Sequence, residues 1–290
     1  MAYVGNQAYH QRDNRNINPV PLDDPNRLAI SQGNYNPDFD RLYPGLGQIT
    51  LGETATTSNY HSLQVNFRVE NRHGFTGQIA YTYSHSFDYL SGDFSQISNP
   101  FDRRFDRGPS DLDRRHIFIA NYIYDLPFFA KSNNGFARSV LGGWEISGIT
   151  TFETGFPLTP TLTYDNLGLG GGATARPDLI SNPSGPQTLN EWFNTGAFVA
   201  PPALSFGNAA RGSIVAPGRN NWNLSLFKVF RMPLPGTTEG GHLDFHVDTF
   251  NTFNHTQFHD VDTGFGGQNF GKVTSTYDAR VIELGMKFLF

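Results

Sequence analysis

The chain has 290 residues, no cysteine and a formal net charge of −5. The absence of cysteine excludes a disulfide framework and thiolate chemistry, and the negative charge argues against a nucleic-acid partner. No stretch of about 18 apolar residues occurs, so the sequence predicts no transmembrane helix. Aromatic residues make up 14% of the chain and charged residues only 16%. This balance suits a β-barrel wall with aromatic side chains at two membrane interfaces.

Alternation of polar and apolar side chains predicts about eight β-strands, because residues two apart in a strand share a face. One segment, at 117–124, is apolar on both faces, so its orientation stays open. No amphipathic helix is predicted, although one helical turn fits residues 188–193. The predicted strands, in chain order, cover about 1–9, 59–70, 75–87, 115–125, 143–154, 221–231, 242–254 and 279–290.

The connections between these strands alternate in length. Short connections fall at 71–74, 131–135 and 233–241. Long connections cover about 11–58, 88–114, 155–220 and 255–278. Compact soluble domains seldom contain several such loops, whereas outer-membrane barrels combine short periplasmic turns with long extracellular loops. The sequence therefore predicts an all-β fold, a transmembrane antiparallel β-barrel whose short turns all lie on the periplasmic side.

The last predicted strand has one polar face, with Glu283 and Gly285, and one apolar face that includes Phe288 and Phe290. Lipid can solvate such an apolar face, so the strand needs no further cover. The terminal pattern resembles the assembly signal of bacterial outer-membrane β-barrels. We expect these four residues to be recognised by the barrel-assembly machinery. The alternative is a C-terminal strand buried in a soluble sandwich.

The first residues contain neither a basic region nor an apolar core, so the sequence predicts no signal peptide. An outer-membrane protein must be exported, and we therefore expect residues 1–290 to be the C-terminal barrel portion of a longer protein. Loops make up about half of the chain. Because small barrels have modest loops, this proportion favours about eight strands of a larger barrel, with the plug domain and signal peptide absent.

Several stretches together resemble the C-terminal portion of TonB-dependent outer-membrane receptors, in particular the Oar-like subgroup that carries a carboxypeptidase-regulatory-like domain. They are residues 2–6, 16–18, 58–64, 111–116, 141–145, 154–157 and 248–255, together with the terminal Phe290. The resemblance implies a barrel of roughly 22 strands, filled by a plug. It implies uptake of a scarce substrate such as a chelate, cobalamin, glycan or peptide, in the bacterial outer membrane. The implied partners are outer-membrane lipid, the remaining strands and plug, and the TonB complex through that plug.

Two sets of loop residues are candidates for ligand contact. The segment 99–116 contains five arginines and four aspartates, including Arg103, Arg104 and Arg107. These guanidinium groups suit an anionic ligand or glycan, but the alternating charges favour a network that neutralises itself within the segment. Trp192 belongs to a set of loop aromatics that could stack on sugars, although packing between loops is favoured. The other members are Phe101, Phe105, Tyr164, Phe193 and Phe198.

A possible metal site is suggested by His242, Asp244, His246 and Asp248, which alternate along one strand face. Neighbours in this set lie about 6.6 Å apart, too far to share a metal without ligands from another strand. We therefore expect these side chains to line the barrel lumen, and no metal or other cofactor is predicted.

Two further patterns carry no predicted chemistry. The glycine-rich segment 168–172 lacks the Lys-Ser/Thr that follows a phosphate-binding loop, and a flexible loop tip is expected. Ser84, His85 and Asp88 match a catalytic triad by residue type only, since no nucleophile elbow surrounds the serine. We therefore expect no enzymatic activity. The alternative functions are a standalone small outer-membrane barrel or surface adhesin, or a secreted carbohydrate-binding β-domain.

Overall fold

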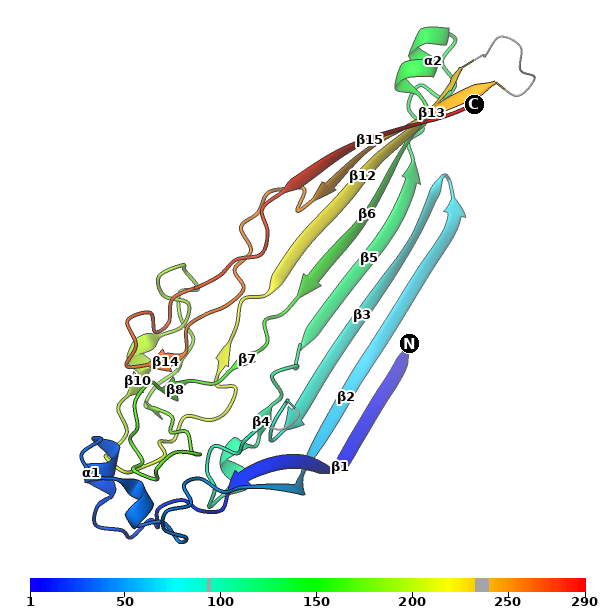
Figure 1. The fold of residues 1–290 in the computed structure, drawn as a ribbon. Coiled ribbons are helices and arrows are strands. Elements are labelled where there is room, and N and C mark those ends of the chain that lie inside the picture. The colour runs from blue at the N-terminus through cyan, green and yellow to red at the C-terminus, as the bar shows by residue number, and fades with distance from the viewer. Residues whose placement is uncertain (93–94, 233–239) are drawn as a thin grey trace.

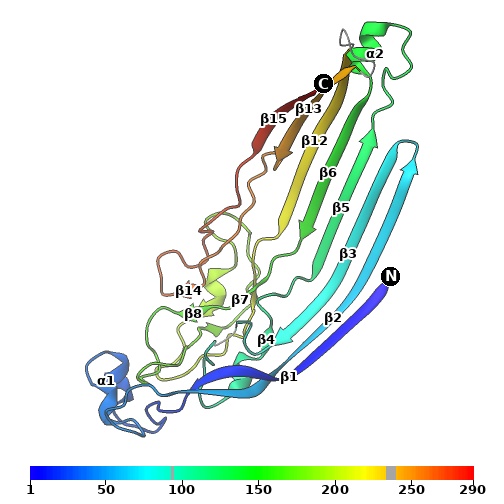
Figure 2. The same ribbon diagram turned by 45° about the vertical axis from the view of Figure 1, so that its right-hand side comes forward.

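The computed structural model describes residues 1–92, 95–232 and 240–290. Its main feature is one twisted antiparallel sheet in which eight long strands lie side by side in chain order (Figure 1, Figure 2). The strands are β1 (Ala2–Asn16), β2 (Thr50–Arg72), β3 (Phe75–Asp88), β5 (His116–Asp125), β6 (Trp144–Glu153), β12 (Arg219–Met232), β13 (Gly241–Phe250) and β15 (Val281–Leu289). Each predicted strand is present, and the all-β antiparallel prediction is confirmed.

The strand register determines the faces that the sequence left open. In β5, Asn121 lies opposite Gln78 of β3, whereas Ala120 lies opposite Ile79. Paired residues share a face of the sheet. Asn121 therefore belongs to the polar face, together with Gln78. Strand β13 ends at Phe250, so Phe253, which falls in the predicted strand, lies beyond it.

Both ends of the sheet are open. Among the described residues, β1 pairs with no strand other than β2, apart from an isolated bridge between Asn14 and Gln96, and β15 pairs with no strand other than β13. The eight strands therefore form a curved wall rather than a closed barrel. Figure 1 shows these two edge strands on opposite sides of the sheet.

The short connections meet at one end of the sheet. Residues 71–74 form the predicted tight turn between β2 and β3, with positive φ angles of 40° at Asn71 and 79° at Gly74. The β5–β6 connection contains the helix α2 (Gly135–Leu141), where no helix was predicted. Its first turn is capped by Asn134, whose side-chain oxygen accepts from the Phe136 amide at 3.0 Å. In the third connection, predicted at 233–241, residues 233–239 lie outside the described residues.

The long connections gather at the opposite end and pack together there (Figure 1, Figure 2). The main buried cluster consists of Phe193, Ala197, Phe198, Ala209, Ile214 and Val261. Short elements punctuate these loops: α1 (Arg27–Ser31), η1 (Pro37–Phe39), η2 (Arg103–Asp106), β4 (Gly108–Pro109), β7 (Pro157–Leu158), β8 (Thr161–Leu162), β9 (Asp178–Leu179), η3 (Thr195–Ala197), β10 (Phe198–Val199), β11 (Ile214–Val215) and β14 (Gly264–Phe265). We call this assembly the loop cluster. No helix in the described part of the chain is long and apolar enough to cross a membrane.

The helical turn predicted at 188–193 does not form. The Thr188 hydroxyl accepts from the Glu191 amide at 3.2 Å, and the Trp192 amide donates to the Gly271 carbonyl at 2.7 Å. These bonds replace those of a helical turn. A 3-10 helix, η3, begins only at Thr195.

Candidate functional site

One face of the sheet is apolar from strand to strand. Val65 lies opposite Tyr81, and Leu226 lies opposite both Ile146 and Val247. The face continues into the last strand, where Leu284, Met286 and Phe288 are exposed. This set is the apolar face that the alternation predicts.

Aromatic rings border the apolar face at two levels. Near the short turns, Trp144 lies edge-on to Phe230, with 6.2 Å between ring centroids. Near the loop cluster, the Phe152 ring packs against Phe118 and Trp222, with 5.8 Å and 5.7 Å between the ring centroids. Eight residue steps from Trp144 to Phe152 span about 26 Å, or about 20 Å of height at a tilt of ~40°. This height is close to the ~25 Å apolar band of outer-membrane barrels.

The opposite face of the sheet is mainly polar. Gln78, Asn121, Ile149 and Asn223 form one row across four strands. A hollow of about 580 Å³ is lined largely by this face. Its polar side chains include Arg68, Gln78, Asn121, Ser147, Asn223, Ser225 and Asp248. Such a surface suits a water-filled lumen.

The His–Asp series of β13 belongs to this polar face. Asp248 accepts from the Ser225 hydroxyl at 2.5 Å. His242 lies 3.9 Å from Asp244, and His246 lies 3.7 Å from Asp248. Within the described residues, no three His, Asp or Glu side chains are grouped to hold a metal ion.

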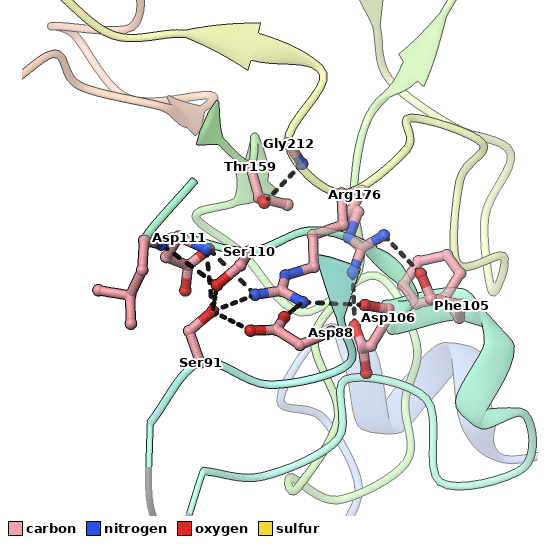
Figure 3. A network of polar contacts seen from close by, with 11 residues as sticks. Asp88, Ser91, Phe105, Asp106, Ser110, Asp111, Thr159, Arg176 and Gly212 are labelled. Atoms are coloured by element: carbon pink, nitrogen blue, oxygen red, sulfur yellow. Dashed lines mark hydrogen bonds and ion pairs between the residues drawn. The ribbon is translucent and has the colours of Figure 1, made fainter. Parts of the chain in front are cut away.

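Two buried arginines join the loop cluster to the end of β3 (Figure 3). Arg211 forms ion pairs with Asp88 and, at 3.1 Å, with Asp111. Arg176 pairs with Asp106 at 2.5 Å. Both arginines come from the long β6–β12 connection, and the aspartates come from the β3–β5 connection or the end of β3. Two of the long connections are thereby fixed to each other.

The Ser91 hydroxyl is part of this network (Figure 3). It accepts from Arg211 at 2.7 Å and donates to Asp88 at 2.8 Å. The guanidinium of Arg176 stacks on the Phe105 ring at 4.0 Å. Burial lowers the pKa of Arg176, while the neighbouring carboxylate opposes this shift.

The charged segment 99–116 does not neutralise itself, which corrects the sequence-based expectation. Only one close pair lies within it, between Arg115 and Asp113 at 3.9 Å. The other partners come from distant segments: Asp13 and Glu53 for Arg103, Arg176 for Asp106, Arg211 for Asp111, and Glu153 for Arg114. The charges therefore connect loops that are far apart in the sequence.

The three predicted ligand-contact arginines have different environments. Arg103 is paired with Asp13, whose side chain is fully buried, at 3.2 Å. Arg104 and Arg107 are exposed, and their side chains form no ion pair or hydrogen bond with the other described residues. They line a pocket of about 540 Å³ together with Asn59, Phe87 and Tyr89. Their role in ligand contact stays a prediction.

Trp192 is held by packing within the loop cluster. Its indole N–H donates to the Val215 carbonyl at 2.8 Å, and its ring lies edge-on to Phe258 at 6.0 Å. Its neighbour Phe193 is buried against Phe198 and other rings. Trp192, Phe193 and Phe198 thus pack within the loop cluster, and ligand contact by Trp192 stays a prediction.

The glycine-rich segment 168–172 is not a loop tip, which is a second correction. Leu169 is only 1% exposed. Backbone carbonyls of the segment accept hydrogen bonds from Arg41 at 2.5 Å, Asn16 at 3.2 Å and Gln96 at 2.8 Å. A Cβ atom at Gly168, where φ is +60°, would lie 2.0 Å from a backbone oxygen. Glycine here permits close packing of backbones.

A second cavity, of about 470 Å³, lies beside the buried arginines. Half of its lining residues carry hydroxyl groups: Tyr89, Ser91, Ser95, Ser98, Thr159, Thr161, Thr174 and Thr263. Phe156 and Leu158 provide apolar contact, and Asp106, Asp111, Arg176 and Arg211 provide charge. The cavity can therefore offer hydrogen bonds to a polar solute at the base of the loops.

The residues of the triad-like pattern do not converge. Ser84 donates to the Arg114 carbonyl at 2.7 Å, whereas His85 contacts Asp113 at 3.0 Å. Because they are neighbours in one strand, their side chains point to opposite faces.

The predicted assembly residues lie along the free edge strand β15. Gly285 lies opposite His246, whose ring Nε2 is 1.6 Å from the place of a Cβ atom at residue 285. Phe288 and Phe290 stack with 5.7 Å between centroids, and Phe290 is 94% exposed. Glu283 lies on the polar face. The part these four residues play in assembly stays a prediction.

An apolar face bordered by aromatic rings, a polar opposite face, and long loops at one end define the wall of an outer-membrane β-barrel. A family model described as "Outer membrane beta barrel domain" matches residues 1–283, and the chain belongs to this family. The protein is therefore located in the bacterial outer membrane, which excludes the alternative of a secreted carbohydrate-binding β-domain.

Among solved structures, the chain is similar to the outer membrane transporter YddB from Escherichia coli. The sequence identity is 11% and the TM-score is 0.48. The comparison covers 98% of this chain and 29% of that one, so the chain spans under a third of that protein's length. No curated protein matches the sequence.

Proposed function

We propose that the chain forms the C-terminal wall and surface loops of a TonB-dependent receptor of the Oar-like type, which takes up a scarce substrate. The observation that carries the proposal is the open sheet with two unpaired edges. Unpaired backbone groups are costly in lipid, and in this proposal further strands of the same barrel pair with β1 and β15. A barrel with more strands than these has a lumen wide enough for a plug or channel.

Two features of the loops support a role in uptake. The polar face presents a hollow of about 580 Å³ toward the lumen. The hydroxyl-lined cavity of about 470 Å³ lies where a substrate would pass from the loops toward that face. The proposed energy coupling is based on the sequence stretches that resemble TonB-dependent receptors. It would act through a plug domain.

The first test is the mass of the native protein in outer-membrane fractions, detected with an antibody against residues 155–220. We expect a band far above the 32.3 kDa of this chain. After crosslinking in the same fraction, the antibody should also detect a heavier product that contains the periplasmic domain of TonB. A high-mass band that never crosslinks to TonB would be consistent with a larger barrel and would contradict the proposed energy coupling.

A standalone small barrel or surface adhesin is the second candidate. The packed loop cluster favours it, because an ordered surface with buried ion pairs suits recognition of a partner. This candidate predicts a band at 32.3 kDa that shifts on boiling. That result would overturn the receptor proposal.

A further inference from the structure

The β5–β6 connection places an exposed apolar group at the short-turn end of the sheet. In this connection, residues 126–143, Phe128 is 63% exposed, Phe129 is 52% exposed and Phe136 is 73% exposed. Phe136 belongs to the helix α2, and Leu141 ends that helix with half of its surface exposed. Figure 1 shows α2 at the same end of the molecule as the C-terminus. We call residues 126–143 the turn anchor.

The turn anchor is attached to the apolar face of the sheet. Trp144 donates its indole N–H to the Val140 carbonyl at 3.1 Å. Lys228, which is almost fully buried, donates to the Gly142 carbonyl and lies 4.9 Å from the Phe230 ring centroid. Trp144 and Phe230 also form the aromatic border of the apolar face at this end. The connection that carries the exposed phenylalanines is thus attached to the aromatic border of the apolar face.

Additional strands of a larger barrel cannot cover this group. Strands β5 and β6 lie in the middle of the sheet, with three strands on either side. Further strands would pair at the edges β1 and β15. The outward side of the turn anchor therefore remains at the membrane surface in a complete barrel.

The charge of the turn anchor indicates which lipid it meets. Residues 126–143 contain Lys131 and Arg138, both exposed, and no acidic residue. Apolar and aromatic side chains combined with cations are typical of segments that lie in the headgroup region and attract anionic lipid. We propose that the turn anchor inserts Phe128, Phe129 and Phe136 into the periplasmic leaflet and binds anionic phospholipid through Lys131 and Arg138. This inference holds whether or not the barrel is a transporter.

The test uses the full-length protein purified from outer membranes. The chain has no cysteine, so Phe136→Cys gives this chain a single position for a fluorescent label. The labelled protein is placed in phosphatidylcholine vesicles that contain the same small fraction of either spin-labelled phosphatidylglycerol or spin-labelled phosphatidylcholine. Quenching of the fluorescence is compared between the two kinds of vesicle. Asn133→Cys, exposed in the same connection, is the matched control. Leu141→Cys repeats the measurement in case Phe136→Cys fails to insert.

We expect strong quenching at residues 136 and 141, weak quenching at 133, and stronger quenching by the anionic lipid. Each cation near an anionic surface contributes about 1 kcal/mol, or about fivefold in binding. Lys131→Gln combined with Arg138→Gln should therefore reduce the preference for phosphatidylglycerol by about five- to thirtyfold. Equal quenching by both lipids would overturn the proposed lipid selectivity. No quenching at either apolar position would overturn the anchor, and would indicate cover by protein.

Discussion

At the scale of single residues, buried ion pairs determine how the loop cluster is held. Arg176 and Asp106 are both nearly inaccessible, so each charge depends on the other for compensation. Removing one partner of a buried pair leaves a charge without solvation, at a cost of about 3–5 kcal/mol. The loop cluster therefore depends on residues that are about 70 positions apart in the sequence.

Asp106→Asn should loosen the loop cluster and leave the sheet intact. We expect faster protease cleavage within residues 155–220 in intact outer membranes, with unchanged membrane insertion. Asp23→Asn, at an exposed position, is the control and should have little effect. Equal cleavage rates for both variants would contradict a structural role for the Arg176–Asp106 pair.

Gly285→Ala should lower the amount of inserted protein because a Cβ atom there would collide with the ring of His246. The reason is steric, so His246→Ala in the same chain should restore insertion. Quantitative blotting of outer-membrane fractions gives the readout. If the double variant remains defective, Gly285 acts instead through recognition by the assembly machinery.

A third residue-scale prediction concerns pH. The Ser275 hydroxyl donates to the Asp260 carboxylate at 2.7 Å, and His259 lies 2.9 Å from the same carboxylate. Both contacts lower the pKa of Asp260, although partial burial opposes the shift. Because this pKa is lower in the folded state, the Asp260 carboxylate stabilises the loop at pH values above its unfolded-state pKa of about 3.9. This contribution is lost as the pH falls through the folded-state pKa.

Hydrogen exchange of residues 255–278 should accordingly show protection that is lost on acidification below about pH 4. Asp260 is largely exposed, so the effect should stay below about 1 kcal/mol. Ser275→Ala should reduce the acid-dependent part of the protection. An identical pH profile for the variant would rule out this contribution.

At the scale of elements, the strands were predictable and their extensions were not. Period-two alternation located most of the eight long strands, and the run of β-branched and aromatic residues at 117–124 located the strand that is apolar on both faces. Strands β1 and β2 continue far beyond the predicted ranges, where their side chains are mostly polar. Register shifts between Ala8 and Asp13, and a positive φ at His10, interrupt the alternation there. The ion pair of Arg15 with Glu53 holds this polar extension together.

The helix α2 escaped prediction because it has only seven residues and no full amphipathic repeat. Its signals were the capping residue Asn134 and the glycine pair at 142–143, which follow the rules for helix ends. Short helices of this kind are set by such caps and by contacts to the sheet, here from Trp144 and Lys228.

The last strand gives the prediction that belongs to this scale. Phe290→Ala should lower outer-membrane insertion without altering the loop cluster, because Phe290 lies at the far end of the sheet and contacts only Phe288 among the described rings. Protease cleavage of residues 155–220 in the inserted fraction is the control. Normal insertion of this variant would contradict an assembly role.

At the scale of the whole molecule, the loop cluster was the part that sequence patterns could not reveal. Its contacts join segments far apart in the chain, and periodicity reports only local structure. One signal was present: Arg211 stands among small, uncharged residues without a nearby opposite charge. An isolated arginine in such a setting indicates a buried pair with a distant acid.

The central claim is that one face of the sheet meets lipid and the other meets water. Single cysteines carrying nitroxide labels at successive positions of β6, residues 145–152, test it directly by paramagnetic relaxation with oxygen and a water-soluble reagent. We expect oxygen contact at residues 146, 148, 150 and 152, and aqueous contact at 145, 147, 149 and 151, as the register requires. Uniform aqueous contact along the strand would contradict the account.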